Sequence, residues 1–206
     1  MSIGAILTQH YIEFKILIMR RWHWGIIFFI LILLTLAPAV LGLGAKPDKE
    51  DLNMSEQKGS LILSSPAFKD QEYIPAKYSC EGKNINPLLK IENVPAGTNS
   101  LTLIVDDPDA PLGTFTHWVL FNIPPQTRQI GENETPPESL QGKNSAGSSK
   151  YTGPCPPPGK IHHYHFKLFA LDAILDLKEG VGKVDVEKSI RNHILAQISL
   201  VGLFKR

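Results

Sequence analysis

Residues 100–123, SLTLIVDDPDAPLGTFTHWVLFNI, contain two strongly apolar segments joined by an acidic turn that includes two prolines. The first segment, Ser100–Val105, is a continuous apolar run of strand length, which is typical of a strand covered on both faces. The second, Phe115–Ile123, is rich in β-branched and aromatic residues and ends at Pro124 and Pro125, which cannot continue a hydrogen-bonded ladder. The stretch therefore predicts two core strands of a β protein.

Other segments extend this pattern. Leu61–Leu63 and Leu88–Ile91 are predicted as short strands, and His162–Leu171 as a long one. The 16 prolines and 16 glycines are clustered and show no period, which favours a loop-rich β architecture over a helical bundle. Residues 131–159 are predicted to form a long loop whose last, proline-dense part is stiff.

The spacing of apolar residues changes near the C-terminus. From Asp185, a suitable N-cap, apolar side chains recur at four-residue steps. The stripe consists of Val186, Ile190, Ile194 and Ile198, widened by Leu195 and Leu200. This spacing predicts an amphipathic C-terminal helix.

The whole chain has the composition of one folded domain with a short appendage. It has 206 residues, of which 43% are hydrophobic and 20% charged. Its 21 basic and 20 acidic residues give a formal net charge of +1, so no nucleic-acid partner is predicted. Residues 46–59 are polar and aperiodic, and they are predicted to link the appendage to a domain spanning residues 60–206.

Residues 1–45 have the features of a signal peptide or a membrane anchor. Two arginines precede residues 25–45, which carry no charge and are long enough to cross a bilayer as a helix. Candidate cleavage sites end at Ala39 and Ala45, and Met19 is a candidate start that would give a compact signal peptide. Without cleavage, the segment would anchor the domain in the membrane. Both alternatives predict an exported domain, either periplasmic, secreted or membrane-anchored.

The turn after the first core strand is the strongest local candidate for chemistry. Asp106, Asp107 and Asp109 lie where that strand ends, and His117 lies in the next strand. A carboxylate beside an imidazole fixes its tautomer and favours its cation, which can hold a phosphate or carboxylate ligand. The alternative is an acidic turn near a histidine that serves only the core.

Four polar residues open the strand that begins at His162. Alternation along a strand places His162 and Tyr164 on the inward face and His163 and His165 on the solvent face. Because alternation divides the histidines between two faces, zinc is disfavoured, and no metal is predicted. The chain has neither a nucleophile elbow nor a phosphate-binding loop, so no catalytic residue or cofactor is predicted either.

The two cysteines, Cys80 and Cys155, lie far apart in the sequence and lack the spacing of a metal site. In an exported domain, an even number of cysteines predicts a disulfide. Two buried free thiols are the better interpretation if the domain stays in the cytosol.

Six segments carry recognisable motifs in a fixed order: YSCEGKNINP (78–87), VPAGT (94–98), DPDAP (107–111), HW (117–118), GPCPPPG (153–159) and HHY (162–164). Together they resemble the phosphatidylethanolamine-binding protein (PEBP) family, in its bacterial and archaeal branch often called Raf-kinase-inhibitor-like. The resemblance covers the chain from about Leu61 to the C-terminus. It departs from the family at Leu88, Ile91 and His163, where Pro, Trp and Arg are usual.

The resemblance implies a two-sheet antiparallel β-sandwich with a small anion-binding pocket at one end. Asp107 and His117 would form the floor, His162 and Tyr164 a wall, and residues 153–157 a rim whose backbone groups meet the anion. The expected ligand-binding residues are Asp107, Asp109, Pro111, His117, Gly153, Pro156, His162 and Tyr164. We expect the Asp107 carboxylate to outweigh burial and keep His117 cationic.

The resemblance also implies a function. The domain would bind a phospholipid head group or another small anion and modulate or inhibit a partner protein outside the cytoplasm, without being an enzyme. One alternative is a hydrolase that uses Asp107 and His117 as its base, although no activated nucleophile accompanies them. Another is a structural envelope protein with no ligand.

Overall fold

The computed structural model describes residues 60–206, which form nine strands, one short 3-10 helix and one α-helix. The expected signal or anchor (residues 1–45) and the linker (residues 46–59) lie outside the described residues. Within residues 60–206, no helix is long and apolar enough to cross a bilayer. The elements are β1 Ile62–Ser64, β2 Glu72–Tyr73, η1 Ala76–Tyr78, β3 Leu89–Glu92, β4 Ser100–Asp107, β5 Phe115–Ile123, β6 Gln129–Ile130, β7 Leu140–Gln141, β8 His162–Leu171, α2 Lys183–Ile190 and β9 Ile194–Phe204.

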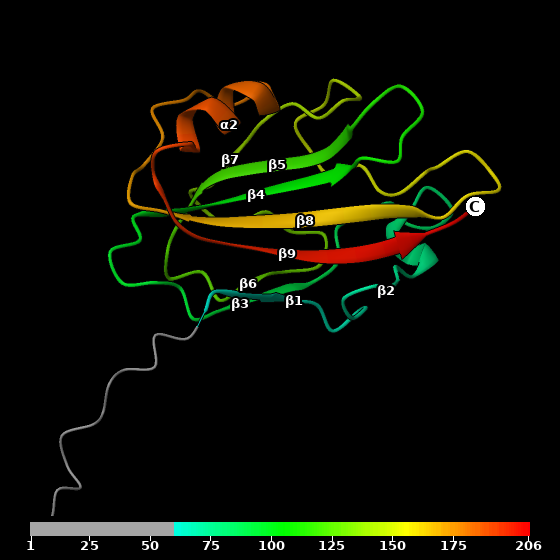
Figure 1. Cartoon of the computed structure of the whole chain (residues 1–206), viewed down its shortest axis with the longest axis horizontal. Coiled ribbons are helices and arrows are strands. Elements are labelled where there is room, and N and C mark those ends of the chain that lie inside the picture. Colours follow the sequence, from blue (N-terminus) through cyan, green and yellow to red (C-terminus); the bar gives the residue numbers. More distant parts are fainter. Residues whose placement is uncertain (1–59) are drawn as a thin grey trace, which may run out of the picture. The chain divides into compact units, whose positions relative to one another are not determined.

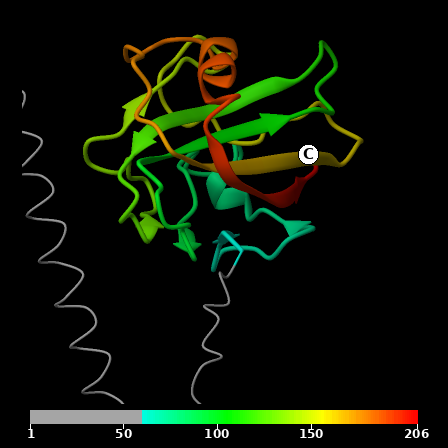
Figure 2. The ribbon, with the colours of Figure 1, turned by 60° about the vertical axis from the view of Figure 1, so that its left-hand side comes forward.

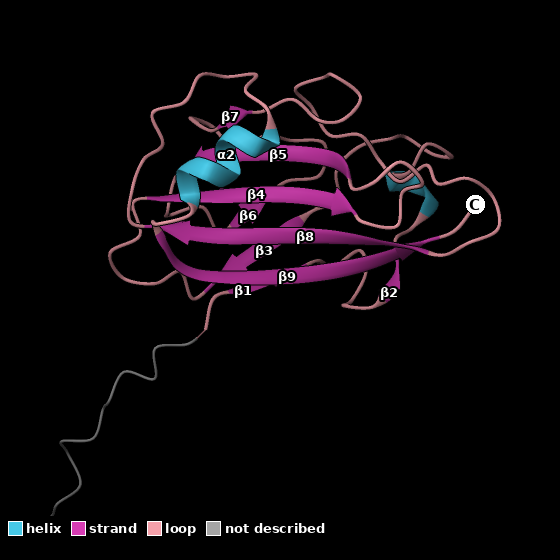
Figure 3. Ribbon diagram, turned by 45° about the horizontal axis from the view of Figure 1, so that its top comes forward, coloured by secondary structure: helices cyan, strands magenta, loops and turns pink. Residues whose placement is uncertain are grey.

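The strands form two sheets (Figure 1). The small sheet has the order β1-β3-β6, and the large sheet has the order β2-β9-β8-β4-β5-β7. All neighbouring strands are antiparallel except β2 and β9, which are parallel, so the large sheet is mixed. Figure 3 shows how strongly strands dominate over helix. The predicted β-sandwich with one C-terminal helix is confirmed, with this single parallel pair as the departure.

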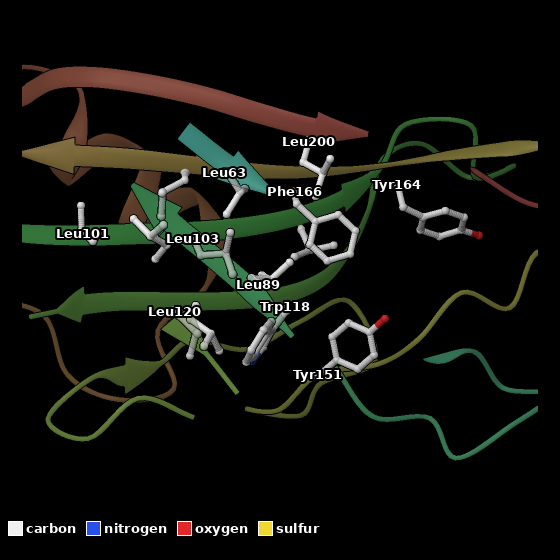
Figure 4. Close-up of a cluster of buried hydrophobic side chains, with 14 of the residues drawn as sticks. Leu63, Leu89, Leu101, Leu103, Trp118, Leu120, Tyr151, Tyr164, Phe166 and Leu200 are labelled. Atoms are coloured by element: carbon white, nitrogen blue, oxygen red, sulfur yellow. The ribbon is translucent and has the colours of Figure 1, made fainter. Parts of the chain in front are cut away.

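The main core lies between the two sheets. Buried side chains from both sheets meet there, with Leu89 from the small sheet and Trp118 and Phe166 from the large one (Figure 4). Along β8, inward-facing residues are buried and the intervening ones are partly exposed, as alternation predicts. This alternation continues to the start of β8, where it directs His162 and Tyr164 inward.

A second core lies on the opposite face of the large sheet. Figure 2 shows the α2 helix lying over that face. Val186 and Ile190 of the helix pack with Ile104 of β4 and with Val119 and Phe121 of β5. Because β4 and β5 are covered on both faces, they carry continuous apolar runs without an alternating pattern.

The predicted C-terminal helix is present but much shorter than its apolar stripe. It starts after Gly182, not at Asp185, and it ends at Ile190. Ile194 and Ile198 lie in β9, which pairs with β8 along its whole length. A four-residue step fits one face of a helix and also, as a multiple of two, one face of a strand. Pairing with β8 decides between them.

The long loop between residues 131 and 159 is ordered by a buried asparagine. The Asn144 amide nitrogen donates hydrogen bonds to the Lys150 carbonyl (2.8 Å) and to Thr152 Oγ1 (2.9 Å). The Thr152 N–H in turn donates to the carbonyl of His117 on β5 (3.0 Å). The loop also contains β7, a short strand that the sequence did not indicate. These bonds hold residues 150–153 beside the end of the large sheet.

Candidate functional site

A cavity of about 160 Å³ opens where β4 ends and where β5 and β8 begin. The turn after β4 forms one side, and the segment that Asn144 holds forms the other. The lining residues are Asp107, Ala110, Pro111, Phe115, His117, Thr152, Gly153, Cys155, Pro156, Pro157, His162 and Tyr164. Seven of the eight predicted site residues are therefore brought together, and Asp109 is not among them.

Asp107 pairs with His162, and both side chains are almost fully buried. Nδ1 of His162 lies 2.7 Å from Oδ2 of Asp107, to which it donates a hydrogen bond. The second oxygen, Oδ1, accepts a hydrogen bond from the Asp109 N–H (2.9 Å). Asp107 therefore fixes the orientation of the imidazole and leaves Nε2 of His162 for a ligand. The expected contact between Asp107 and His117 is wrong, because the carboxylate faces the β8 histidine.

His117 is held by a backbone carbonyl. Its Nδ1 donates to the Thr152 carbonyl oxygen (2.6 Å), so Nε2 is the nitrogen left for a ligand. Burial lowers the pKa of His117, although the Thr152 carbonyl and the Asp107 carboxylate act in the opposite direction. The prediction that the carboxylate outweighs burial is therefore wrong. Asp107 is already paired with His162, so its charge reaches His117 only from beyond contact distance.

Tyr164 presents an unused polar group to the cavity. The residue is 1% exposed, and its hydroxyl has no hydrogen-bond partner among residues 60–206. Burial, then the charge of the Asp107 carboxylate and an approach to that carboxylate that does not meet hydrogen-bond geometry, raise the pKa of Tyr164, so the hydroxyl stays protonated and can donate. Figure 4 shows this hydroxyl at the end of the core, pointing away from the packed side chains. The ring of Tyr164 stands edge-on to that of His117, with 5.1 Å between the ring centroids.

The rim is stapled by the Cys80–Cys155 disulfide, which confirms the predicted pairing. Gly153 approaches η1 so closely that a Cβ atom there would lie 2.2 Å from the Tyr78 carbonyl oxygen, which explains the glycine. The Gly153 N–H donates to Oδ1 of Asn84 (2.7 Å). That donor is already used, so it does not meet an anion as the family resemblance implied.

Asp109 does not line the cavity, and its side chain binds His163 on the outer side of the turn. Its Oδ2 accepts hydrogen bonds from the backbone N–H (2.8 Å) and from Nδ1 (2.7 Å) of His163, whose side chain is exposed. The hydrogen bond from this side chain lowers the pKa of Asp109. The unusual histidine at position 163 therefore ties the turn after β4 to β8.

Asp106 lies on the other face of the sheet. Its Oδ2 accepts from Nζ of Lys167 (3.1 Å) and Nζ of Lys183 (2.8 Å), and its Oδ1 accepts from the Thr116 hydroxyl (3.1 Å). Successive residues of a strand point to opposite faces, so the carboxylates of Asp106 and Asp107 never form one cluster. Within residues 60–206, no group of three or more metal-ligating side chains could hold an ion.

Sequence reasoning missed several residues of the cavity, chiefly Phe115 and Thr152. The Phe115 ring is tilted against that of His117, with 4.8 Å between the ring centroids. Thr152 contributes its backbone carbonyl oxygen, which accepts from His117. Every residue has such a carbonyl, so the residue type at position 152 could not indicate this role. Its position next to the Gly153 motif was the one available signal.

Comparison with known sequences gives a consistent result. A family model described as phosphatidylethanolamine-binding protein matches residues 64–205. The chain is 47% identical over 174 residues to the UPF0098 protein PH1269 of Pyrococcus horikoshii, covering 81% of this chain and 84% of that protein. It is 46% identical over 149 residues to a UPF0098 protein of Methanothermobacter thermautotrophicus, covering 70% of this chain and 98% of that protein.

Solved structures share the fold. A crystal structure from Chlamydia trachomatis, assigned as a PEBP homologue, superposes with a TM-score of 0.69 at 38% identity and covers 71% of this chain and 98% of its own. Escherichia coli YbcL, described as a member of the mammalian PEBP family, superposes with a TM-score of 0.68 at 28% identity and covers 72% and 99%.

Proposed function

The chain belongs to the phosphatidylethanolamine-binding protein family, and from this premise we propose that its cavity binds a small anion such as phosphate or a phospholipid head group. The observation that carries the proposal is the buried Tyr164 hydroxyl, which has no partner within residues 60–206. Leaving a buried hydroxyl unpaired costs about 1 to 3 kcal/mol, so a ligand that accepts its hydrogen bond would gain affinity from this group.

The two histidines set the charge that a ligand meets. Nδ1 of His117 and Nδ1 of His162 are both committed to protein oxygens, so each ring offers Nε2 to the cavity. A neutral ring offers a lone pair there, and only a protonated ring offers a donor. Because burial lowers the pKa of His117, its ring is neutral in the empty cavity at neutral pH. An anion would therefore bind together with a proton.

The size of the cavity limits what fits. Its volume of about 160 Å³ is well below the roughly 300 to 1,000 Å³ of pockets that enclose drug-sized molecules. A whole phospholipid does not fit, whereas its phosphate group does. The acyl chains of a lipid ligand would remain outside the rim formed by residues 153–157.

Isothermal titration calorimetry with sulfate, phosphate and phosphoethanolamine tests the proposal. We expect His117→Ala to weaken sulfate binding about 10- to 100-fold, which is the range for a charge-assisted hydrogen bond. His165→Ala is the matched control, because His165 lies on β8 but faces away from the cavity. Equal affinity in the wild type and His117→Ala would overturn the proposal. A preference for phosphoethanolamine over phosphate would identify a head group as the ligand.

The alternative function is a hydrolase. Its base would be formed by Asp107 and His162, and not by Asp107 and His117 as the sequence suggested. The carboxylate and imidazole in contact are Asp107 and His162, a pair that could act as a general base. Among residues 60–206, no serine lines the cavity, and the one lining cysteine, Cys155, is in the disulfide. Turnover of phospho- or carboxyl-esters that disappears in His162→Ala would favour the enzyme. We propose that no such turnover occurs.

We further propose that the domain acts outside the cytoplasm, where it modulates a partner protein in response to the bound anion. The Cys80–Cys155 disulfide supports this location, because disulfides persist in oxidising compartments. The basic and apolar order of residues 20–45 supports it as well. Fractionation of the native host that finds the chain in the cytosol with two alkylatable thiols would contradict this location.

A further inference from the structure

The Cys80–Cys155 disulfide is both exposed and part of the cavity wall. Both cysteines are exposed residues, and Cys155 is one of the residues that line the cavity. Exposed disulfides are more easily reduced than other structural disulfides. A thiol in solution can therefore approach this disulfide while the domain stays folded.

An arginine lies against both sulfur atoms. Nη1 of Arg206 is 3.2 Å from Sγ of Cys155 and 3.9 Å from Sγ of Cys80. The Arg206 carbonyl accepts a hydrogen bond from the Gly159 N–H (3.1 Å), and Figure 1 shows the end of the chain beside this loop. Among residues 60–206, no carboxylate forms an ion pair with Arg206. Its charge is therefore available to the sulfur atoms.

The charge of Arg206 favours one direction of chemistry at the disulfide. A cation beside a thiol lowers its pKa, and a disulfide is opened faster when the departing sulfur is a more stable thiolate. Sγ of Cys155 is the sulfur closer to the guanidinium, so it is the better leaving group. The acidic groups nearby oppose this effect only weakly, because Glu81 is exposed and Asp107 is paired with His162.

We propose that the Cys80–Cys155 disulfide is a thiol–disulfide exchange site through which a dithiol controls the anion cavity. A thiolate of the dithiol attacks Sγ of Cys80, the S–S bond breaks, and Cys155 departs with the electron pair as a thiolate beside Arg206. The second sulfur of the dithiol then attacks the mixed disulfide and releases Cys80. The dithiol loses two electrons and two protons. One proton passes to Cys80, and the other enters the solvent.

The control of the cavity rests on the proposed function, because it assumes that an anion binds there. Reduction places a negative charge on Cys155, in the wall of the cavity, where the disulfide carried none. This charge repels an anion. The rim keeps two hydrogen bonds to the segment around η1, from the Cys80 N–H to the Pro154 carbonyl (3.0 Å) and from the Gly153 N–H to Asn84 (2.7 Å). The reduced domain should therefore stay folded and bind anions more weakly.

The rate of reduction of the full-length chain by dithiothreitol tests the exchange site without any anion. We expect Arg206→Gln to be reduced about threefold to tenfold more slowly than the wild type, because the departing thiolate loses its cation. Lys205→Gln is the matched control. It removes the same charge from the neighbouring residue, which has no hydrogen bond to either sulfur. Equal rates in the wild type and Arg206→Gln would overturn the exchange site.

The pKa values of single thiols identify the leaving sulfur. In Cys80→Ser, the pKa of the remaining Cys155 thiol, measured from its rate of alkylation by iodoacetamide, should lie below that of an unperturbed cysteine. In Cys155→Ser, the pKa of the Cys80 thiol should lie closer to the unperturbed value. The reverse order would overturn the assignment of Cys155 as the thiolate.

Calorimetry with sulfate tests the control of the cavity. Both single-cysteine variants lack the disulfide, so they differ in which thiol remains. Above the pKa of Cys155, we expect Cys80→Ser to bind sulfate about threefold to tenfold more weakly than Cys155→Ser, because only the first carries a thiolate in the cavity wall. Equal affinity in the two variants would overturn the control. If the oxidised wild type bound no sulfate, the proposed function and this control would both fail, whereas the reduction rates would still decide the exchange site.

Discussion

The two faces of the large sheet use the same kinds of buried group in different ways. At the end of β4, Asp106 faces α2 and accepts hydrogen bonds from two lysines and a threonine. Asp107, the next residue, faces the cavity and holds a single histidine. The charge of Asp106 is matched entirely within the protein. On the cavity face, the Asp107–His162 pair instead leaves Nε2 of His162 for a ligand to bind.

Each face also contains one buried hydroxyl without a partner among residues 60–206. Thr102, by alternation from Leu101 and Leu103, lies on the α2 face, and Tyr164 lies in the cavity. The comparison shows that an unpaired group alone does not make a site. Tyr164 differs because two ring nitrogens and an open volume lie beside it, whereas Thr102 lies in packed side chains.

The largest effect is expected on the α2 face. In Asp106→Asn, two lysine ammonium groups lose their buried carboxylate, which should lower the free energy of unfolding by about 3 kcal/mol. Although burial alone would lower it, the pKa of Lys183 is raised by its hydrogen bond to Asp106, and this raised pKa should be lost as well. Urea denaturation measures the change in stability. Sulfate affinity should not change, because this carboxylate lies outside the cavity, and a large loss would contradict the division between the faces.

The next largest effect is expected on the cavity face, where sulfate affinity should depend on pH through His117. Burial holds the pKa of His117 below its usual value in the empty cavity, and a bound anion should raise it. Above the lowered pKa, sulfate binding then takes up one proton, so affinity should fall with rising pH by up to about tenfold, or 1.4 kcal/mol, per pH unit. Sulfate remains a dianion from pH 5 to 8, which removes the titration of the ligand. Calorimetry over this range measures the slope, and His117→Ala should flatten it. A slope that persists in His117→Ala would contradict the assignment of the proton to His117.

Tyr164→Phe should act on stability and binding with opposite signs. Removing an unpaired buried hydroxyl should raise the free energy of unfolding of the empty protein by about 1 kcal/mol. The same change removes a donor from the cavity and should weaken sulfate binding about fivefold to tenfold. Thermal unfolding with and without sulfate reads both effects in one experiment. A destabilised empty protein would show that the hydroxyl already has a partner.

The smallest effect is expected for Thr102→Val, which tests whether the unpaired hydroxyl of the α2 face differs from that of Tyr164. The substitution conserves shape and removes the unpaired hydroxyl of the α2 face, so it should stabilise the protein by about 0.5 to 1 kcal/mol. Unlike Tyr164→Phe, it should leave sulfate binding unchanged. A loss of anion affinity in Thr102→Val would mean that any change in the sheet disturbs the cavity, and the effects of Tyr164→Phe could not then be assigned to a direct contact.

The sequence by itself determined the β-rich fold, the inward direction of His162 and Tyr164, and the disulfide partners. These features depend on local or countable properties: apolar runs, the two-residue period of a strand, and an even number of cysteines. The same period would also have separated Asp106 from Asp107, because adjacent strand residues point to opposite faces. The motifs of the family were enough to place seven of the eight expected residues around one cavity.

Only the tertiary structure decided which groups touch. Asp107 contacts His162 and not His117, because the strand order places β8 and β5 on either side of β4 and the carboxylate turns toward β8. The protonation of His117 depends on how completely its neighbours bury it, which its own sequence does not show. Likewise, Ile194 and Ile198 fit a helix or a strand equally well. The choice required the backbone hydrogen bonds of β8, which are made between segments distant in sequence and carry no local signal.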